Sequence, residues 1–127
     1  MGRMAQLVPW IRGRLDRFGV ALSALCALHC VLGLILIAGL GVGVGGSWLL
    51  HPAVHKVGLA VAILIAGVAI GIGAVRHRRA LPFVIAMMGL SFMGGGLAVG
   101  HGMEEAVLTI IGVILVGSAH LLNLRRG

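Results

Sequence analysis

The part of the sequence best suited to chemistry is the motif Cys26-Ala27-Leu28-His29-Cys30. In a helix, residues three and four positions apart share a face, so the two thiols and the imidazole would point the same way. The β-carbons of an i, i+4 pair lie about 5–6 Å apart, whereas a disulfide requires roughly 3.8 Å. A soft ion held by bonds of about 2.3 Å can bridge the two sulfurs. The spacing therefore favours a metal site for Hg(II), Cu(I) or Zn(II).

The same motif has other interpretations. Cysteine is a small apolar residue that packs well between helices, so a packing role for Cys26 and Cys30 is the first alternative. A thiol oxidoreductase that uses this pair is another, although the helical spacing disfavours an internal disulfide. His29 favours a functional interpretation, because it lies deep in a long uncharged stretch. An ionisable side chain at membrane depth is costly unless it is paired or faces a cavity.

A second group of residues, in two segments that we expect to connect helices on the outer side of the membrane, could capture a cation. His51 and His55 are spaced i, i+4, and His101 lies close to the acidic pair Glu104 and Glu105. If the two connecting segments meet, their imidazoles and carboxylates would suit a borderline cation such as Zn(II). The alternative is that these side chains are simply solvated.

His120 is a further candidate, about 8 Å inside the membrane boundary at Arg125 by helical rise. It could stand on an exit path from Cys26, or hydrogen-bond to a neighbouring helix. His29 and His120 could also be the two axial ligands of a haem-binding or quinone-reactive membrane subunit. Their expected depths differ by about 10 Å, which disfavours that alternative.

The composition indicates that membrane-spanning helices position these residues. The chain has 127 residues, of which 60% are hydrophobic and 10% are charged. Soluble domains carry about 25% charged residues, and disordered chains combine low hydrophobicity with high charge. Both classes are therefore excluded. The three acidic residues assemble neither a catalytic triad nor a paired-carboxylate site, so we do not expect an enzyme.

Charged residues divide the chain into apolar stretches long enough to cross a bilayer, which takes about 20 helical residues. Four spans are predicted, near residues 18–40, 53–75, 81–99 and 106–124. The expected fold is thus all-α, a polytopic membrane protein with a four-helix bundle in a single domain over residues 1–127. Residues 1–17 are expected to form a basic interfacial helix that leads into the first span.

The distribution of basic residues predicts the orientation of the bundle. Nine of the ten would lie on one side: Arg3, Arg12, Arg14, Arg17, Arg76, Arg78, Arg79, Arg125 and Arg126. Only Lys56 lies on the other side, so both termini are predicted to be cytoplasmic. The net charge of +7 then reflects topology and affinity for membrane lipid, and no nucleic-acid partner is expected. Stripes of small residues such as Gly58, Ala62 and Ala66 permit close helix packing and a homo-oligomer.

The cysteine motif in the first of four short spans, with His120-Leu-Leu-Asn-Leu-Arg-Arg closing the fourth, resembles the MerC-domain family. These are small multi-pass proteins of the bacterial inner membrane. The resemblance covers nearly the whole chain and implies that Cys26 and Cys30 receive Hg(II) and pass it to the cytoplasm. The C-x-x-x-C spacing is wider than in the mercury-specific members of the family.

The sequence therefore predicts membrane transport or binding of a thiophilic metal ion, with mercuric ion uptake as the leading hypothesis. The primary ligands are Cys26, His29 and Cys30, and the second rank comprises His51, His55, His101 and His120. No permanently bound cofactor is expected. Zinc or copper handling, a haem or quinone subunit and a purely structural subunit are the alternatives.

Overall fold

The computed structural model describes residues 2–40, 51–100 and 103–125. Within these ranges the chain is entirely helical and contains no strand. Its elements are α1 (Gly2–Leu40), α2 (Pro52–His77), α3 (Leu81–Val99) and α4 (Met103–Arg125). Each of the four is long and apolar enough to cross a membrane. The predicted all-α, four-span architecture is confirmed.

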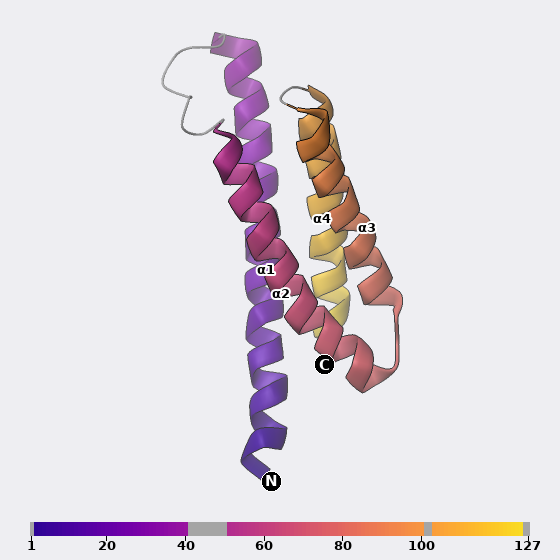
Figure 1. The fold of residues 1–127 in the computed structure, drawn as a ribbon. Coiled ribbons are helices and arrows are strands. Elements are labelled where there is room, and N and C mark those ends of the chain that lie inside the picture. The colour runs from indigo at the N-terminus through magenta and orange to yellow at the C-terminus, as the bar shows by residue number, and fades with distance from the viewer. Residues whose placement is uncertain (1, 41–50, 101–102, 126–127) are drawn as a thin grey trace.

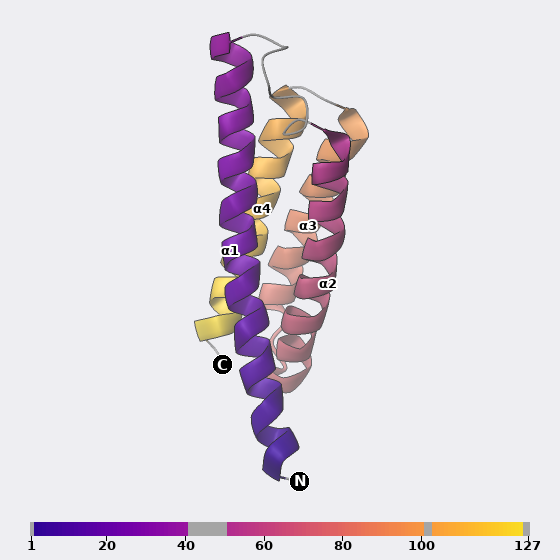
Figure 2. The same ribbon diagram turned by 90° about the vertical axis from the view of Figure 1, so that its left-hand side faces the viewer.

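The four helices alternate in direction, so helices adjacent in sequence are antiparallel (Figures 1 and 2). Both termini lie at the same end of the bundle as the turn between α2 and α3 (Figure 1). At about 1.5 Å per residue, the 39 residues of α1 exceed the roughly 30 Å of a hydrocarbon core. The N-terminal part of α1 accordingly projects beyond the other helices (Figure 2).

The ends of α2 follow from its local sequence. Pro52 occupies the first turn, where its missing N–H costs no hydrogen bond. His51 is the N-cap, and its Nδ1 accepts a hydrogen bond of 3.2 Å from the backbone N–H of Ala53. At the other end Arg78 adopts a left-handed conformation with φ of 51° and terminates the helix. The chain then turns into α3 within a few residues.

Residues 2–17, predicted to form an interfacial helix, are the first part of α1 and continue into the span without a break. Two residues of its polar face, Arg12 and Asp16, are buried, whereas Leu7, Ile11 and Phe18 are exposed. Arg12 and Asp16 therefore face the bundle, whereas Arg14 of the same predicted polar face is exposed. The reason is that α4 offers hydrogen-bonding partners to this part of α1.

Close packing between α3 and α4 depends on two glycines that face each other. A β-carbon added at Gly89 would lie 2.7 Å from the backbone oxygen of Gly112 and 2.9 Å from the backbone nitrogen of Val116. Because these are backbone atoms, the crowding could be relieved only by separating the helices. Small residues at helix contacts allow such close approach in membrane bundles.

We expect Gly89→Ala to lower the free energy of unfolding by about 1–3 kcal/mol, the usual cost of overpacking a tight contact. Gly94→Ala on the same helix is the matched control, because no atom lies within 4 Å of the added β-carbon. Denaturant titration in detergent, followed by circular dichroism, measures both. Equal stabilities of the two variants would contradict the close α3–α4 contact.

Candidate metal centre

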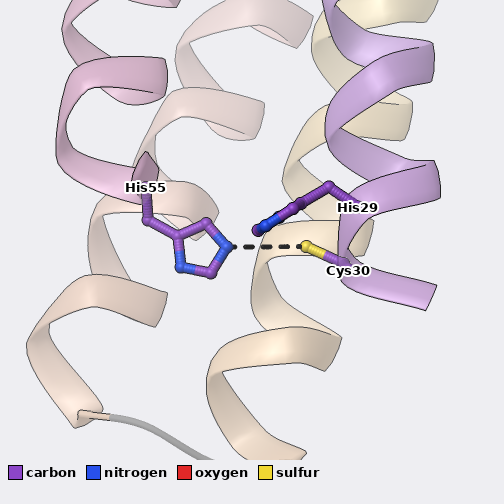
Figure 3. A group of neighbouring side chains, drawn as sticks. All are labelled: His29, Cys30 and His55. Carbon is purple, nitrogen blue, oxygen red and sulfur yellow. Dashed lines mark hydrogen bonds between the residues drawn. The ribbon is translucent and has the colours of Figure 1, made fainter. Parts of the chain in front are cut away.

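The cysteine motif lies on α1, at the level where the first turns of α2 pass alongside it. Cys30 is buried, whereas His29 and Cys26 are half-buried. His55 of α2 faces the same space, and its ring points towards His29 and Cys30 (Figure 3). The ligand atoms of His29, Cys30 and His55 all lie within 4.8 Å of one another. Two helices thus bring one thiol and two imidazoles together.

The separation of these donors suits a metal ion between them. Cys30 Sγ lies 3.9 Å from His55 Nε2, and the ring centroids of His29 and His55 are 5.3 Å apart. Sulfur and nitrogen bind zinc at about 2.3 and 2.0–2.1 Å. From these bond lengths, two such donors stand roughly 3.5 Å apart around a tetrahedral ion and about 4.4 Å apart across a linear one. The observed spacing lies between these values.

A carboxylate behind His55 fixes the orientation of its ring. Glu105 of α4 is buried, and its Oε1 lies 2.8 Å from His55 Nδ1. A carboxylate oxygen accepts this bond, so Nδ1 carries the proton and Nε2 presents its lone pair towards Cys30. Histidine ligands of metals commonly have such a carboxylate partner, which fixes the tautomer and raises ligand basicity. His55 could therefore bind a metal ion through Nε2.

A cavity of about 580 Å³ adjoins this group, mainly between α1 and α2. Its chemically distinctive lining residues are Cys26, His29, His55, Met93 and Thr109. Cys26 is separate from the compact three-residue group and lies one helical turn further along α1 towards the termini. The predicted primary set is therefore divided: His29 and Cys30 join His55, while Cys26 stands next along the same cavity.

The second-rank histidines have different surroundings. His51 is exposed and caps α2, whereas His55 belongs to the three-residue group. His101 lies outside the described residues. His29 and His120, the pair considered for haem, line different cavities.

A buried polar network that was not predicted from the sequence lies at the end of the bundle where the termini lie. His120 Nδ1 lies 2.7 Å from Asp16 Oδ1, and Asn123 Nδ2 donates to Asp16 Oδ2 at 2.7 Å. Arg12 NH1 extends the network to Asn123 Oδ1 at 3.5 Å and to His77 Nε2 at 3.2 Å. A signal was present, because Arg12 and Asp16 are spaced i, i+4 and His120 and Asn123 are spaced i, i+3.

The family assignment agrees with this geometry. A family model described as MerC mercury resistance protein matches residues 16–125, which is most of the 127-residue chain. The chain belongs to the MerC family. The suspected resemblance is thus confirmed. None of the curated proteins and none of the solved structures compared with the chain matches it significantly.

Membership of the MerC family makes this chain a mercury-resistance-related, multi-pass membrane protein. The family is associated with membrane transport and is not an enzyme family. The matched region spans every residue of the three-donor group, its buried carboxylate Glu105 and the buried network around His120.

If the three-residue group holds Hg(II), Glu105→Gln is expected to weaken that binding by roughly 10–100-fold, the usual effect of losing a carboxylate behind a histidine ligand. Glutamine keeps the size of the side chain but removes the charge that supports His55. Glu104→Gln is the control, since Glu104 is exposed one residue away. Competition titration of the detergent-purified protein against a monothiol measures both affinities. A similar affinity for both variants would show that Glu105 does not support the ligand.

Proposed function

We propose that this protein transports a thiophilic metal ion, with Hg(II) as the principal substrate, inwards across the bacterial inner membrane. The observation that carries the proposal is the convergence of His29, Cys30 and His55 around one point beside a cavity. A thiolate with imidazoles is a soft donor set, which suits Hg(II), Cu(I) or Zn(II) and is unsuited to Ca(II) or Mg(II). Membership of the MerC family favours mercury among these ions.

The placement of the metal group supports an inward direction. His29 and Cys30 lie in the second half of α1 and His55 in the first turn of α2, so the group lies towards the end of the bundle opposite the two termini. The arginines of the described residues lie in the first half of α1, around the α2–α3 turn and at the end of α4. By the preference of basic residues for the cytoplasmic side, the metal group then faces the periplasm. An incoming ion would meet this group first.

The chemistry of capture requires a deprotonated thiol. When a divalent ion binds, Cys30 loses its S–H proton and its sulfur becomes a ligand, while the neutral imidazoles bind through ring nitrogen. Glu105 adds a second negative charge behind His55. One thiolate and one carboxylate balance the two positive charges of the ion, which lowers the cost of holding it in an apolar environment. Cys26 then lies one turn further along α1 to receive it.

Uptake of labelled Hg(II) by bacteria with and without the protein tests this proposal. We expect the initial rate to rise with expression, and an excess of Zn(II) or Cu(I) to compete according to its fit to the site. Rates equal to those of cells without the protein would overturn mercury uptake. Suppression by Zn(II) stronger than by unlabelled Hg(II) would instead identify zinc as the substrate.

A further inference from the structure

His120 has the surroundings of a metal ligand. Its side chain is only 1% exposed and Asp16 is fully buried, so their contact of 2.7 Å is isolated from solvent. The Asp16 carboxylate accepts the bond, so Nδ1 carries the proton and Nε2 keeps its lone pair. Among the described residues, His120 makes this one hydrogen bond, through Nδ1. Its other nitrogen is therefore available.

Nε2 of His120 lies against α1, and the His120 side chain borders a cavity that Cys26 also lines. Nε2 approaches α1 at Gly19, where an added β-carbon would overlap the imidazole. A small cavity of about 10 Å³ is lined by both Cys26 and His120. A cavity of this volume admits roughly one water-sized sphere, which is also the scale of a single metal ion. Cys26 lines this cavity as well as the large one, so it stands between them.

Each end of the bundle has a buried carboxylate that accepts a hydrogen bond from a histidine Nδ1. At one end, Glu105 accepts from His55 Nδ1, and Nε2 faces the thiol of Cys30. At the other end, Asp16 accepts from His120 Nδ1, and the ring borders the cavity that contains Cys26. In both places a buried carboxylate fixes a histidine that shares space with a thiol, as expected of histidine ligands of metals. The cysteines themselves are one helical turn apart.

We propose that Cys26 and His120 form a second, inner station for the same soft cation, with Asp16 as the positioning residue behind His120. This inference rests on the proposed transport function and adds a path to it. The transfer is a ligand exchange: the bond from the ion to Cys30 sulfur breaks as the bond to Cys26 sulfur forms. The thiol proton of Cys26 passes to the Cys30 sulfur, so one proton moves opposite to the ion and no electron is transferred.

A crossed set of variants tests the inner station in the detergent-purified, full-length protein. The Cys26→Ser variant retains only the outer thiol, that of Cys30. The Cys30→Ser variant retains only the inner thiol, that of Cys26. Into each background we introduce His55→Asn or His120→Asn, which keep an N–H donor for the carboxylate but remove Nε2. The affinity for Hg(II) is then measured by competition with a monothiol.

We expect His120→Asn to weaken Hg(II) binding at least about tenfold in the Cys30→Ser background, and less than twofold in the Cys26→Ser background. His55→Asn is expected to show the opposite pattern. Asp16→Asn is the second test of the inner station, and it should weaken Hg(II) binding in the same background as His120→Asn does. Because a general folding defect would reduce binding in both backgrounds alike, only a loss confined to the Cys30→Ser background supports the inner station.

Equal effects of His120→Asn in both backgrounds, or no effect in either, would overturn the inner station. Such a result would leave the transport proposal intact if uptake by the unaltered protein still exceeds that of control cells. If the unaltered protein does not bind Hg(II), the transport proposal itself is overturned. The two failures are therefore distinguishable.

Discussion

Replacing Cys30 by serine is expected to reduce Hg(II) uptake to the level of cells that lack the protein. Cys30 supplies the thiol of the three-residue group, and His29 and His55 alone offer the ion no sulfur. A serine hydroxyl is a hard, protonated donor that binds soft ions poorly. Even partners behind metal ligands change affinity by roughly 10–100-fold, so loss of the sulfur ligand itself should have a larger effect. The initial rate of labelled Hg(II) uptake measures it.

Cys26→Ser should also abolish uptake, but for a different reason. The ion still binds at Cys30 and then lacks the thiol that accepts it one turn further along α1. Bound Hg(II) should therefore still protect Cys30 from alkylation in the purified Cys26→Ser protein. A site that needs both sulfurs for one ion would instead lose this protection, and the compact group of His29, Cys30 and His55 would not be the first binding site.

Ala24→Ser is the control for both cysteine variants, since it adds a hydroxyl to the exposed face of the same helix. It should transport at the rate of the unaltered protein. Substantial uptake by Cys30→Ser, at equal expression, would contradict the assignment of Cys30 as the entry ligand. It would direct attention to the histidines and acidic residues at the outer mouth.

The helices were predictable because charged residues interrupt the apolar stretches in a simple pattern. The predicted spans 53–75, 81–99 and 106–124 lie within α2, α3 and α4. The common face of His29 and Cys30 also follows from helical spacing alone. By contrast, the partnership of Cys30 with His55 depends on how α1 and α2 cross, and periodicity along one helix contains no information on that crossing. The sequence placed His55 only in a separate outer group.

The burial of Asp16 could not be predicted for a related reason. A charged residue near the end of an apolar stretch is normally assigned to the headgroup region, where water solvates it. In this protein α4 places His120 and Asn123 beside it, so the carboxylate has partners inside the bundle. Contacts across more than 100 residues decide between the two environments. The i, i+4 spacing of Arg12 and Asp16 indicates only that they share a face.

The largest effect on stability is expected for Asp16→Ala. The carboxylate is fully buried, accepts hydrogen bonds from His120 and Asn123, and shares its network with the buried guanidinium of Arg12. Removing it leaves the N–H groups of His120 and Asn123 without their acceptor and takes the negative charge out of a buried network that contains the Arg12 guanidinium. Removing one member of such a buried charged network lowers the free energy of unfolding by about 3–5 kcal/mol. Denaturant titration in detergent measures the free energy of unfolding.

Arg17→Leu is the matched control, because Arg17 is exposed next to Asp16 on the same helix. Surface substitutions of this kind usually change stability by less than about 0.5 kcal/mol. Similar stabilities for Asp16→Ala and Arg17→Leu would mean that the network is hydrated in the folded protein and contributes little to its stability.

The double variant Asp16→Ala/Arg12→Leu separates the stabilising role of the network from its role towards His120. It removes both the positive and the negative charge of the buried network that Asn123 links, so much of the lost stability should return, as found when buried charges are replaced together by apolar residues. Uptake of Hg(II) should not return, because no carboxylate then holds the Nδ1–H of His120 and its ring loses its fixed orientation. Recovery of both properties together would show that Asp16 acts only through folding. Recovery of stability without uptake would assign the buried carboxylate to the path of the ion.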